Sequence, residues 1–171
     1  MTAPRDRYEA KRNTEGKHMT SSTSVQRRPV QLAALAVGIV FLLVGILGFI
    51  PGVTSDFDTL TFAGHHSEAK LLGIFQVSVL HNIVHLLFGV VGIAMARAGA
   101  TARGYLIGGG VVYLVLWLYG LVIDHDSAAN FVPVNTADNW LHLGLGVAMI
   151  VLGVILGREI ERTAATPRTT Y

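Results

Sequence analysis

Four long apolar segments divide the chain, and short polar stretches separate them. The segments are PVQLAALAVGIVFLLVGILGFI (29–50), LLGIFQVSVLHNIVHLLFGVVGIAMA (71–96), GYLIGGGVVYLVLWLYGLVI (104–123) and NWLHLGLGVAMIVLGVILG (139–157). Each is close to or above the about 20 residues that a helix needs to cross a bilayer core about 30 Å thick. The short alternating segments of a membrane β-barrel are not visible in the sequence. The pattern predicts an all-α fold, an integral membrane four-helix bundle over residues 29–158.

Charged residues lie unevenly between the two sides of these segments. Basic residues precede the first segment, lie between the second and third, and follow the fourth, whereas the other two connections hold most of the acids and only one basic residue, Lys70. Basic residues mark the cytoplasmic side of membrane proteins. We therefore expect a multi-pass plasma-membrane protein with both termini in the cytoplasm. Residues 1–28 read as a disordered cytoplasmic tail, and residues 159–171 as a short cytoplasmic tail.

The composition supports a membrane protein and excludes several kinds of chemistry. Hydrophobic residues make up 51% of the chain and charged residues 14%, against about 25% charged in typical soluble domains. Without any Cys, the chain has no thiol redox chemistry, Cys-ligated zinc, iron–sulfur cluster or covalent c-type haem. No nucleophile–base set, phosphate loop or nucleic-acid stripe is visible. We predict no catalytic residue, no metal site and no nucleic-acid partner. The expected partners are the lipid bilayer and either another membrane protein or a second copy of the chain.

An internal repeat links the second and fourth segments. NIVHLLFGV (82–90) and NWLHLGLGV (139–147) share N-x-x-H-L-x-x-G-V. A weaker alignment pairs GIVFLLVGILG (38–48) with GVVYLVLWLYG (110–120). The repeat predicts two helix hairpins related by a pseudo-two-fold axis along the membrane normal.

The repeat also predicts that two polar groups meet near the outer leaflet. Polar residues in membrane helices are costly, and they usually serve packing, a ligand or a pathway. Residues one helical turn apart share a face, and the pseudo-symmetry brings the two halves together. The resulting candidate cluster is His81, Asn82, His85, Asp138, Asn139 and His142.

Three interpretations of this cluster remain open. The leading one is an interhelical hydrogen-bond clamp, supported by small residues spaced for close helix approach, namely Gly104/Gly108, Gly92/Ala96 and Gly153/Gly157. The second is a site for a quinone head group, a non-covalent haem or a divalent metal. The third, a proton or solute pathway, lacks polar residues in the inner halves of the helices.

We accordingly expect a non-enzymatic structural or accessory membrane component with an Asn/His hydrogen-bonded cluster and no cofactor. The alternative is a redox-associated membrane module that binds quinone or haem.

The motif segments resemble a known family. KLLGIFQVSVLHNIVHLLFGVVGIAMAR and PVNTADNWLHLGLGVAMIVLG are similar to the bacterial membrane proteins grouped as domain of unknown function 4383, through H-N-x-x-H-L-x-F-G and N-T-A-D-N-W-L-H-L. The resemblance covers all four apolar segments. It implies a four-helix membrane protein of unassigned activity and transfers no catalytic residue. A more distant similarity to DoxX-like four-helix proteins, some linked to quinone-coupled oxidation, rests on architecture alone, which does not transfer function.

Overall fold

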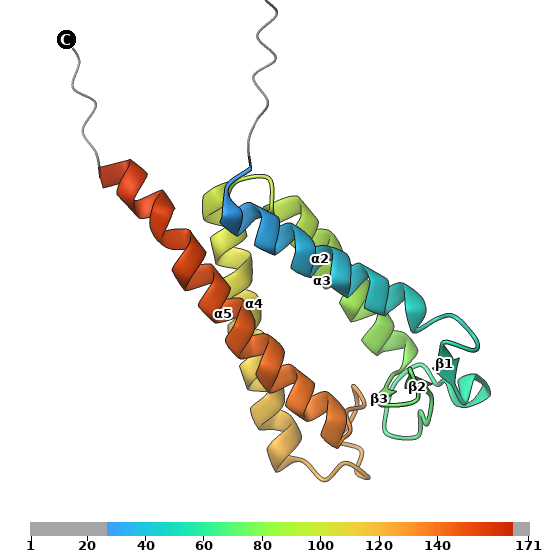
Figure 1. Ribbon diagram of the computed structural model, residues 1–171. Coiled ribbons are helices and arrows are strands. Elements are labelled where there is room, and N and C mark those ends of the chain that lie inside the picture. Colours follow the sequence, from blue (N-terminus) through green and yellow to red (C-terminus); the bar gives the residue numbers. More distant parts are fainter. Residues whose placement is uncertain (1–26, 166–171) are drawn as a thin grey trace, which may run out of the picture.

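The chain forms four α-helices and a small sheet in a computed structural model that describes residues 27–165, with side chains up to Arg158 (Figure 1). Residues 1–26 and 166–171 of the two predicted tails lie outside these residues. The last helix continues beyond residue 157, where the fourth apolar segment ends. The helices are α2 (Pro29–Leu47), α3 (Val79–Met95), α4 (Gly99–Val122) and α5 (Thr136–Ala165).

The helices pack as two neighbouring pairs. The most extensive contacts join α2 to α3 and α4 to α5, and smaller contacts between the pairs close the bundle. A short turn at residues 96–98 connects α3 to α4. Figure 1 shows α2 and α3 side by side, with the small sheet beyond one end of this pair.

Among residues 27–165, three helices are long and apolar enough to cross a membrane: α2, α4 and the Thr136–Arg158 part of α5. The fourth, α3, is also apolar but has 17 residues. At 1.5 Å per residue it is about 26 Å long, slightly less than the hydrocarbon thickness. The predicted segment 71–96 is therefore longer than the helix inside it.

Residues 70–71 and 75–76 form strands, although residues 71–96 were predicted to form one helix. The all-α prediction therefore missed a small sheet. Its antiparallel strand order is β1-β2-β3. Leu72 and Gly73 adopt left-handed backbone conformations, with φ of 55° and 72°, and the chain reverses direction there. An apolar run alone does not distinguish such a turn from a helix. The strands are β1 (Thr54–Ser55), β2 (Lys70–Leu71) and β3 (Phe75–Gln76), with a 3-10 helix, η1 (Phe57–Thr59), after β1.

Large apolar side chains cover the outside of all four helices. Leu43 of α2 is 51% exposed, Leu87 of α3 61%, Val115 of α4 59% and Val151 of α5 45%. A soluble monomer rarely exposes so much contiguous apolar surface. This is the surface expected of a protein surrounded by lipid.

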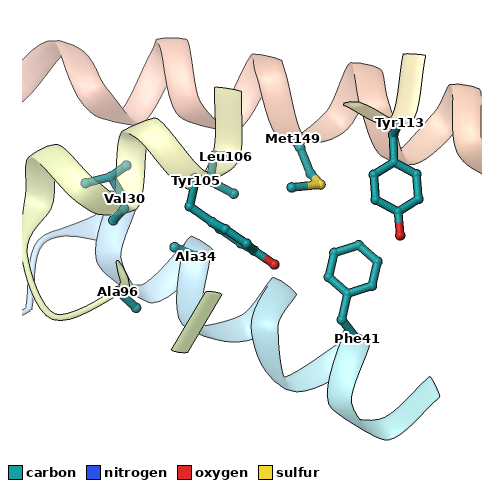
Figure 2. Close-up of a cluster of buried hydrophobic side chains, with 9 residues drawn as sticks. Val30, Ala34, Phe41, Ala96, Tyr105, Leu106, Tyr113 and Met149 are labelled. Atoms are coloured by element: carbon teal, nitrogen blue, oxygen red, sulfur yellow. The ribbon is translucent and has the colours of Figure 1, made fainter. Parts of the chain in front are cut away.

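Aromatic rings fill the core between the two helix pairs. Phe41 of α2 and Tyr113 of α4 stack with ring centroids 5.3 Å apart and an interplanar angle of 18°, and Figure 2 shows the two rings next to each other. Phe88 of α3 packs edge-on against Phe41 at 5.3 Å. Further along the core, Leu106 and Met149 are buried beside these rings.

Glycines bring the two backbones of each pair into direct contact. A Cβ on Gly38 would lie 3.0 Å from the carbonyl oxygen of Gly89, and one on Gly89 would lie 2.8 Å from the carbonyl oxygen of Gly38. The second pair repeats this contact: the corresponding distances between Gly110 and Gly146 are 2.7 Å and 3.0 Å. These contacts fix how each pair of helices is aligned.

The other predicted small-residue contacts are only partly present. Nothing lies within 4 Å of a Cβ built on Gly108, and the nearest atom for Gly104 is 3.9 Å away. This pair was therefore wrongly predicted to bring helices together, because spacing alone does not show which face of a helix is covered. Gly92 does lie against the Tyr105 ring, and Gly153 against Ile107.

The contrast between Gly110 and Gly108 gives a stability test. Gly110→Ala should lower the free energy of unfolding by about 1–3 kcal/mol, because its Cβ would collide with the backbone of α5. Gly108→Ala, on the same helix, should leave stability unchanged or raise it by up to about 1 kcal/mol, since Ala favours helix. Thermal unfolding of both variants in one detergent measures the difference. Equal melting temperatures would contradict the α4–α5 contact.

Candidate functional site

Three buried histidines meet inside the bundle. His81 and His85, one turn apart on α3, stack their rings with centroids 4.6 Å apart. His142 of α5 packs edge-on against Tyr113 at 5.2 Å, and Phe41 packs edge-on against His85 at 5.6 Å. The three imidazoles are 5–9% exposed. The aromatic core thus forms one wall of a histidine cluster.

Two cavities border this cluster. The larger, about 280 Å³, lies between α3, α4 and the segment 131–134, and the smaller, about 100 Å³, lies between α2, α5 and the sheet. The same four side chains line both cavities: His81, His85, Tyr113 and His142. We call these four residues the histidine wall.

Away from the histidine wall, the larger cavity is lined almost entirely by apolar side chains. Three of them, Val84 of α3, Val115 of α4 and Phe131 of the following loop, are also 42%, 59% and 58% exposed on the outside of the protein. The cavity therefore reaches the lipid-facing surface between α3 and α4. A concave apolar site with a few convergent polar groups is the usual form of a small-molecule site.

Backbone carbonyls bind one nitrogen on each ring of the α3 histidines. Nδ1 of His81 lies 3.3 Å from the carbonyl oxygen of Pro133, and Nδ1 of His85 lies 3.2 Å from the carbonyl oxygen of His81. Nδ1 of His142 is buried without a partner. Within the described part of the chain, no hydrogen bond reaches Nε2 of any of the three rings. Buried polar atoms are normally paired, and the buried Nδ1 of His142 is an exception, which makes this cluster the candidate functional site.

The loop before α5 holds the Pro133 carbonyl in place. Asn130 is fully buried, and its side-chain amide donates to the carbonyl oxygens of His125 (3.0 Å) and Val134 (3.2 Å). Its Oδ1 accepts from the Val134 N–H at 3.0 Å. The Tyr119 hydroxyl donates to the carbonyl oxygen of Ala129. These bonds give the loop a defined shape above His81.

Asp138 connects the start of α5 to the sheet. Its Oδ2 accepts from the backbone N–H groups of Asn135 and Gln76, both at 3.0 Å. The Asn135 side chain accepts in turn from the Asp138 N–H at 3.0 Å, which completes a reciprocal cap at the helix N-terminus. Asp138 also lines the smaller cavity beside the three histidines.

The two asparagines of the predicted cluster serve the helix pairs instead. The Asn82 side chain lies against Gly48 at the end of α2, and the Asn139 side chain lies against Gly120 of α4. In residues 27–158, the Asn82 amide and Oδ1 of Asn139 have no hydrogen-bond partner. The predicted hydrogen bonds between asparagine and histidine are therefore not formed. Asn and His at positions i and i+3 share one broad helix face, and the sequence does not show that they pack against different parts of the protein.

Sequence reasoning left three contributors out of the site. Phe41 and Tyr113 are paired by the alignment of 38–48 with 110–120, so the repeat held a signal for them. Pro133 contributes through its carbonyl, which its residue type does not reveal. In the described residues, no group of three or more His, Cys, Asp or Glu side chains is arranged to hold a metal ion.

Comparison with known proteins gives one match. A family model described as "Domain of unknown function (DUF4383)" matches residues 31–155, well over half of the chain. No curated protein and no solved structure matches.

The Asp138 cap gives a test of how the site is assembled. Asp138→Ala should lower stability by about 1 kcal/mol, because it removes a helix cap, and should loosen the contact of β3 with α5. Trypsin should then cleave faster after Lys70, the only basic residue between α2 and Arg97. Asp58→Ala, at an exposed position in η1, is the control. Unchanged cleavage in the Asp138 variant would contradict the proposed connection.

Proposed function

Because the chain belongs to the DUF4383 family, whose description names no activity, we propose its function from the site alone. The protein is an integral membrane protein that binds the head group of a lipid-soluble, quinone-type molecule at the histidine wall. The proposal assigns binding and no chemical conversion.

The observation that carries this proposal is the shared wall of the two cavities. Three buried imidazoles and a tyrosine hydroxyl converge there, and their free nitrogens have no protein partner among the described residues. Polar groups inside a membrane bundle are expensive and are usually functional. A ligand that pairs with them removes that cost.

The size and lining of the larger cavity favour a single-ring head group. Its volume of about 280 Å³ is just below the roughly 300–1,000 Å³ typical of ligand pockets. The aromatic wall suits a planar ring, and the opening between Val84 and Val115 lets a hydrocarbon tail extend into lipid. A haem is disfavoured, because the stacked Phe41 and Tyr113 rings occupy the space between the helix pairs that a four-ring macrocycle would need.

The two asparagines keep a structural role in this proposal. Asn82 on Gly48 and Asn139 on Gly120 make matching contacts in the two helix pairs, as do the Gly38–Gly89 and Gly110–Gly146 contacts. These matches support two hairpin repeats about a pseudo-two-fold axis. Phe41 and Tyr113, which the sequence alignment equates, stack on each other between the repeats.

The proposed setting is the plasma membrane, with α3 as a fourth crossing and both termini in the cytoplasm. The distribution of basic residues supports this orientation. Direct packing of α3 along α2 supports a crossing by the shorter helix, since small mismatches in hydrophobic length are accommodated by the bilayer.

Quinone binding is testable in mild detergent. A decyl-benzoquinone should quench the fluorescence of Trp117, whose neighbour Leu116 lines the larger cavity. His85→Ala and His142→Ala should each weaken the binding of decyl-benzoquinone or of its reduced quinol about tenfold, the cost of one lost hydrogen bond. His66→Ala, in the outer loop and outside both cavities, is the matched control.

Two results would contradict the proposal. One is that neither decyl-benzoquinone nor its quinol binds, or that the binding of both is unaffected by the His85 and His142 variants. The other is a Soret absorption band in the purified protein that disappears in those variants, which would favour haem.

The orientation has its own test. A reporter that is active only outside the cytoplasm should be inactive when fused after residue 171. The same reporter inserted at Gly64, in the connection between α2 and α3, should be active. The reverse pattern would contradict the proposed orientation.

A further inference from the structure

We propose that the histidine wall selects a ligand whose head group donates a hydrogen bond, a hydroxyl and not a carbonyl. For a quinone-type molecule this means the reduced quinol form. The inference rests on the proposed function, and it names the chemical form of the ligand that the same site prefers.

The hydrogen bonds of the α3 histidines decide where their protons lie. A backbone carbonyl oxygen only accepts hydrogen bonds, so Nδ1 of His81 must donate to Pro133, and Nδ1 of His85 must donate to the His81 carbonyl. In a neutral imidazole, the nitrogen without a proton is an acceptor. Nε2 of both rings therefore presents a bare lone pair.

The surroundings favour the neutral rings. An unpaired charge buried in an apolar bundle is costly, and within residues 27–158 no ion pair joins Asp138 to His81, His85 or His142. Asp138 lines only the smaller cavity, where its Oδ2 already accepts two backbone N–H groups. The larger cavity has no acidic side chain in its lining.

Both lone pairs are accessible from the cavities. Both rings line the two cavities. Among the described residues, Nε2 of His81 and Nε2 of His85 form no hydrogen bond, and neither atom is fully buried. The two rings stack at 4.6 Å with an interplanar angle of 23°. A head group at the histidine wall thus meets two neighbouring acceptors.

This arrangement should bind a hydroxyl more tightly than a carbonyl. A hydroxyl can donate to one Nε2, and its oxygen can accept from the Tyr113 hydroxyl, which has no partner among the described residues and lines both cavities. A carbonyl oxygen could also accept from the Tyr113 hydroxyl, but it has no proton to donate to either Nε2 and would face their lone pairs with lone pairs of its own. In an apolar site such a mismatch is not relieved by water, and leaving one buried acceptor unpaired weakens binding about tenfold.

The test compares one molecule in its two redox states. Decyl-benzoquinone and the quinol formed from it by two-electron reduction are titrated against the full-length protein by calorimetry, anaerobically, in the same detergent. The quinol should bind at least about tenfold more tightly. Equal affinity, or tighter binding of the quinone, overturns the hydroxyl preference and leaves the proposed binding function intact. Failure of both forms to bind overturns the proposed function itself.

A variant tests whether the preference for the quinol comes from hydrogen-bond direction and not from unequal partitioning of the two forms into detergent. The amide of His85→Gln can donate as well as accept, so the quinol-to-quinone affinity ratio should fall towards one when measured in the same micelles. His66→Ala should keep the ratio of the parent protein. A ratio unchanged in His85→Gln would contradict the assigned role of His85.

The proton positions are also measurable without a ligand. In the protein labelled with ¹⁵N-histidine, nuclear magnetic resonance distinguishes a protonated ring nitrogen from a bare one, and His81→Gln and His85→Gln assign the two signals. We expect a protonated Nδ1 and a bare Nε2 in both rings. A proton on Nε2 of either ring would overturn the inference, even if the quinol binds.

Discussion

In hydrocarbon, every polar group of a protein has to find its partner inside the protein or in a ligand. The four helices meet this constraint for their backbones, and the connecting loops meet it through a few buried side chains. Asn130 pairs with three backbone groups of its loop, and Asp138 pairs with backbone groups from two parts of the chain. Among the described residues, the constraint is left open at the side chains of Asn82 and Asn139 and at the histidine wall. The rings of the histidine wall line two cavities, and the proposed ligand would be the partner of their free nitrogens.

The helix pairs supply the rigidity that this site needs. Where Gly38 meets Gly89, and where Gly110 meets Gly146, the helix backbones touch directly, and a single extra methyl group would shift them. Alignment of each pair then sets the edge-on contacts of Phe41 with His85 and of Tyr113 with His142. The polar residues thus sit on closely packed elements, and packing decides the position of the rings.

The sequence predicted the architecture better than the chemistry. Hydropathy located four helices, and the repeated motif drew attention to His85 and His142, which line the same two cavities. It did not reveal β2 and β3, because the apolar run 71–76 hides a turn at Leu72 and Gly73. The different neighbours of Asn82 and His85 were also hidden, since one helix face can pack against a glycine at one position and line a cavity three residues later. Pro133 acts through its backbone carbonyl, so its role cannot be predicted from the identity of its side chain.

The loop before α5 bears on how the proposed site can diverge during evolution. Its Phe131 borders the opening of the larger cavity, and its Pro133 carbonyl sets the proton on His81. Altering the length or shape of this loop would therefore change both what can enter and what is preferred, while every histidine stays in place. Under the proposed function, relatives with identical N-x-x-H motifs would then differ in ligand. Divergence of specificity in this architecture should be sought in loop geometry, where comparison of residue identities is least informative.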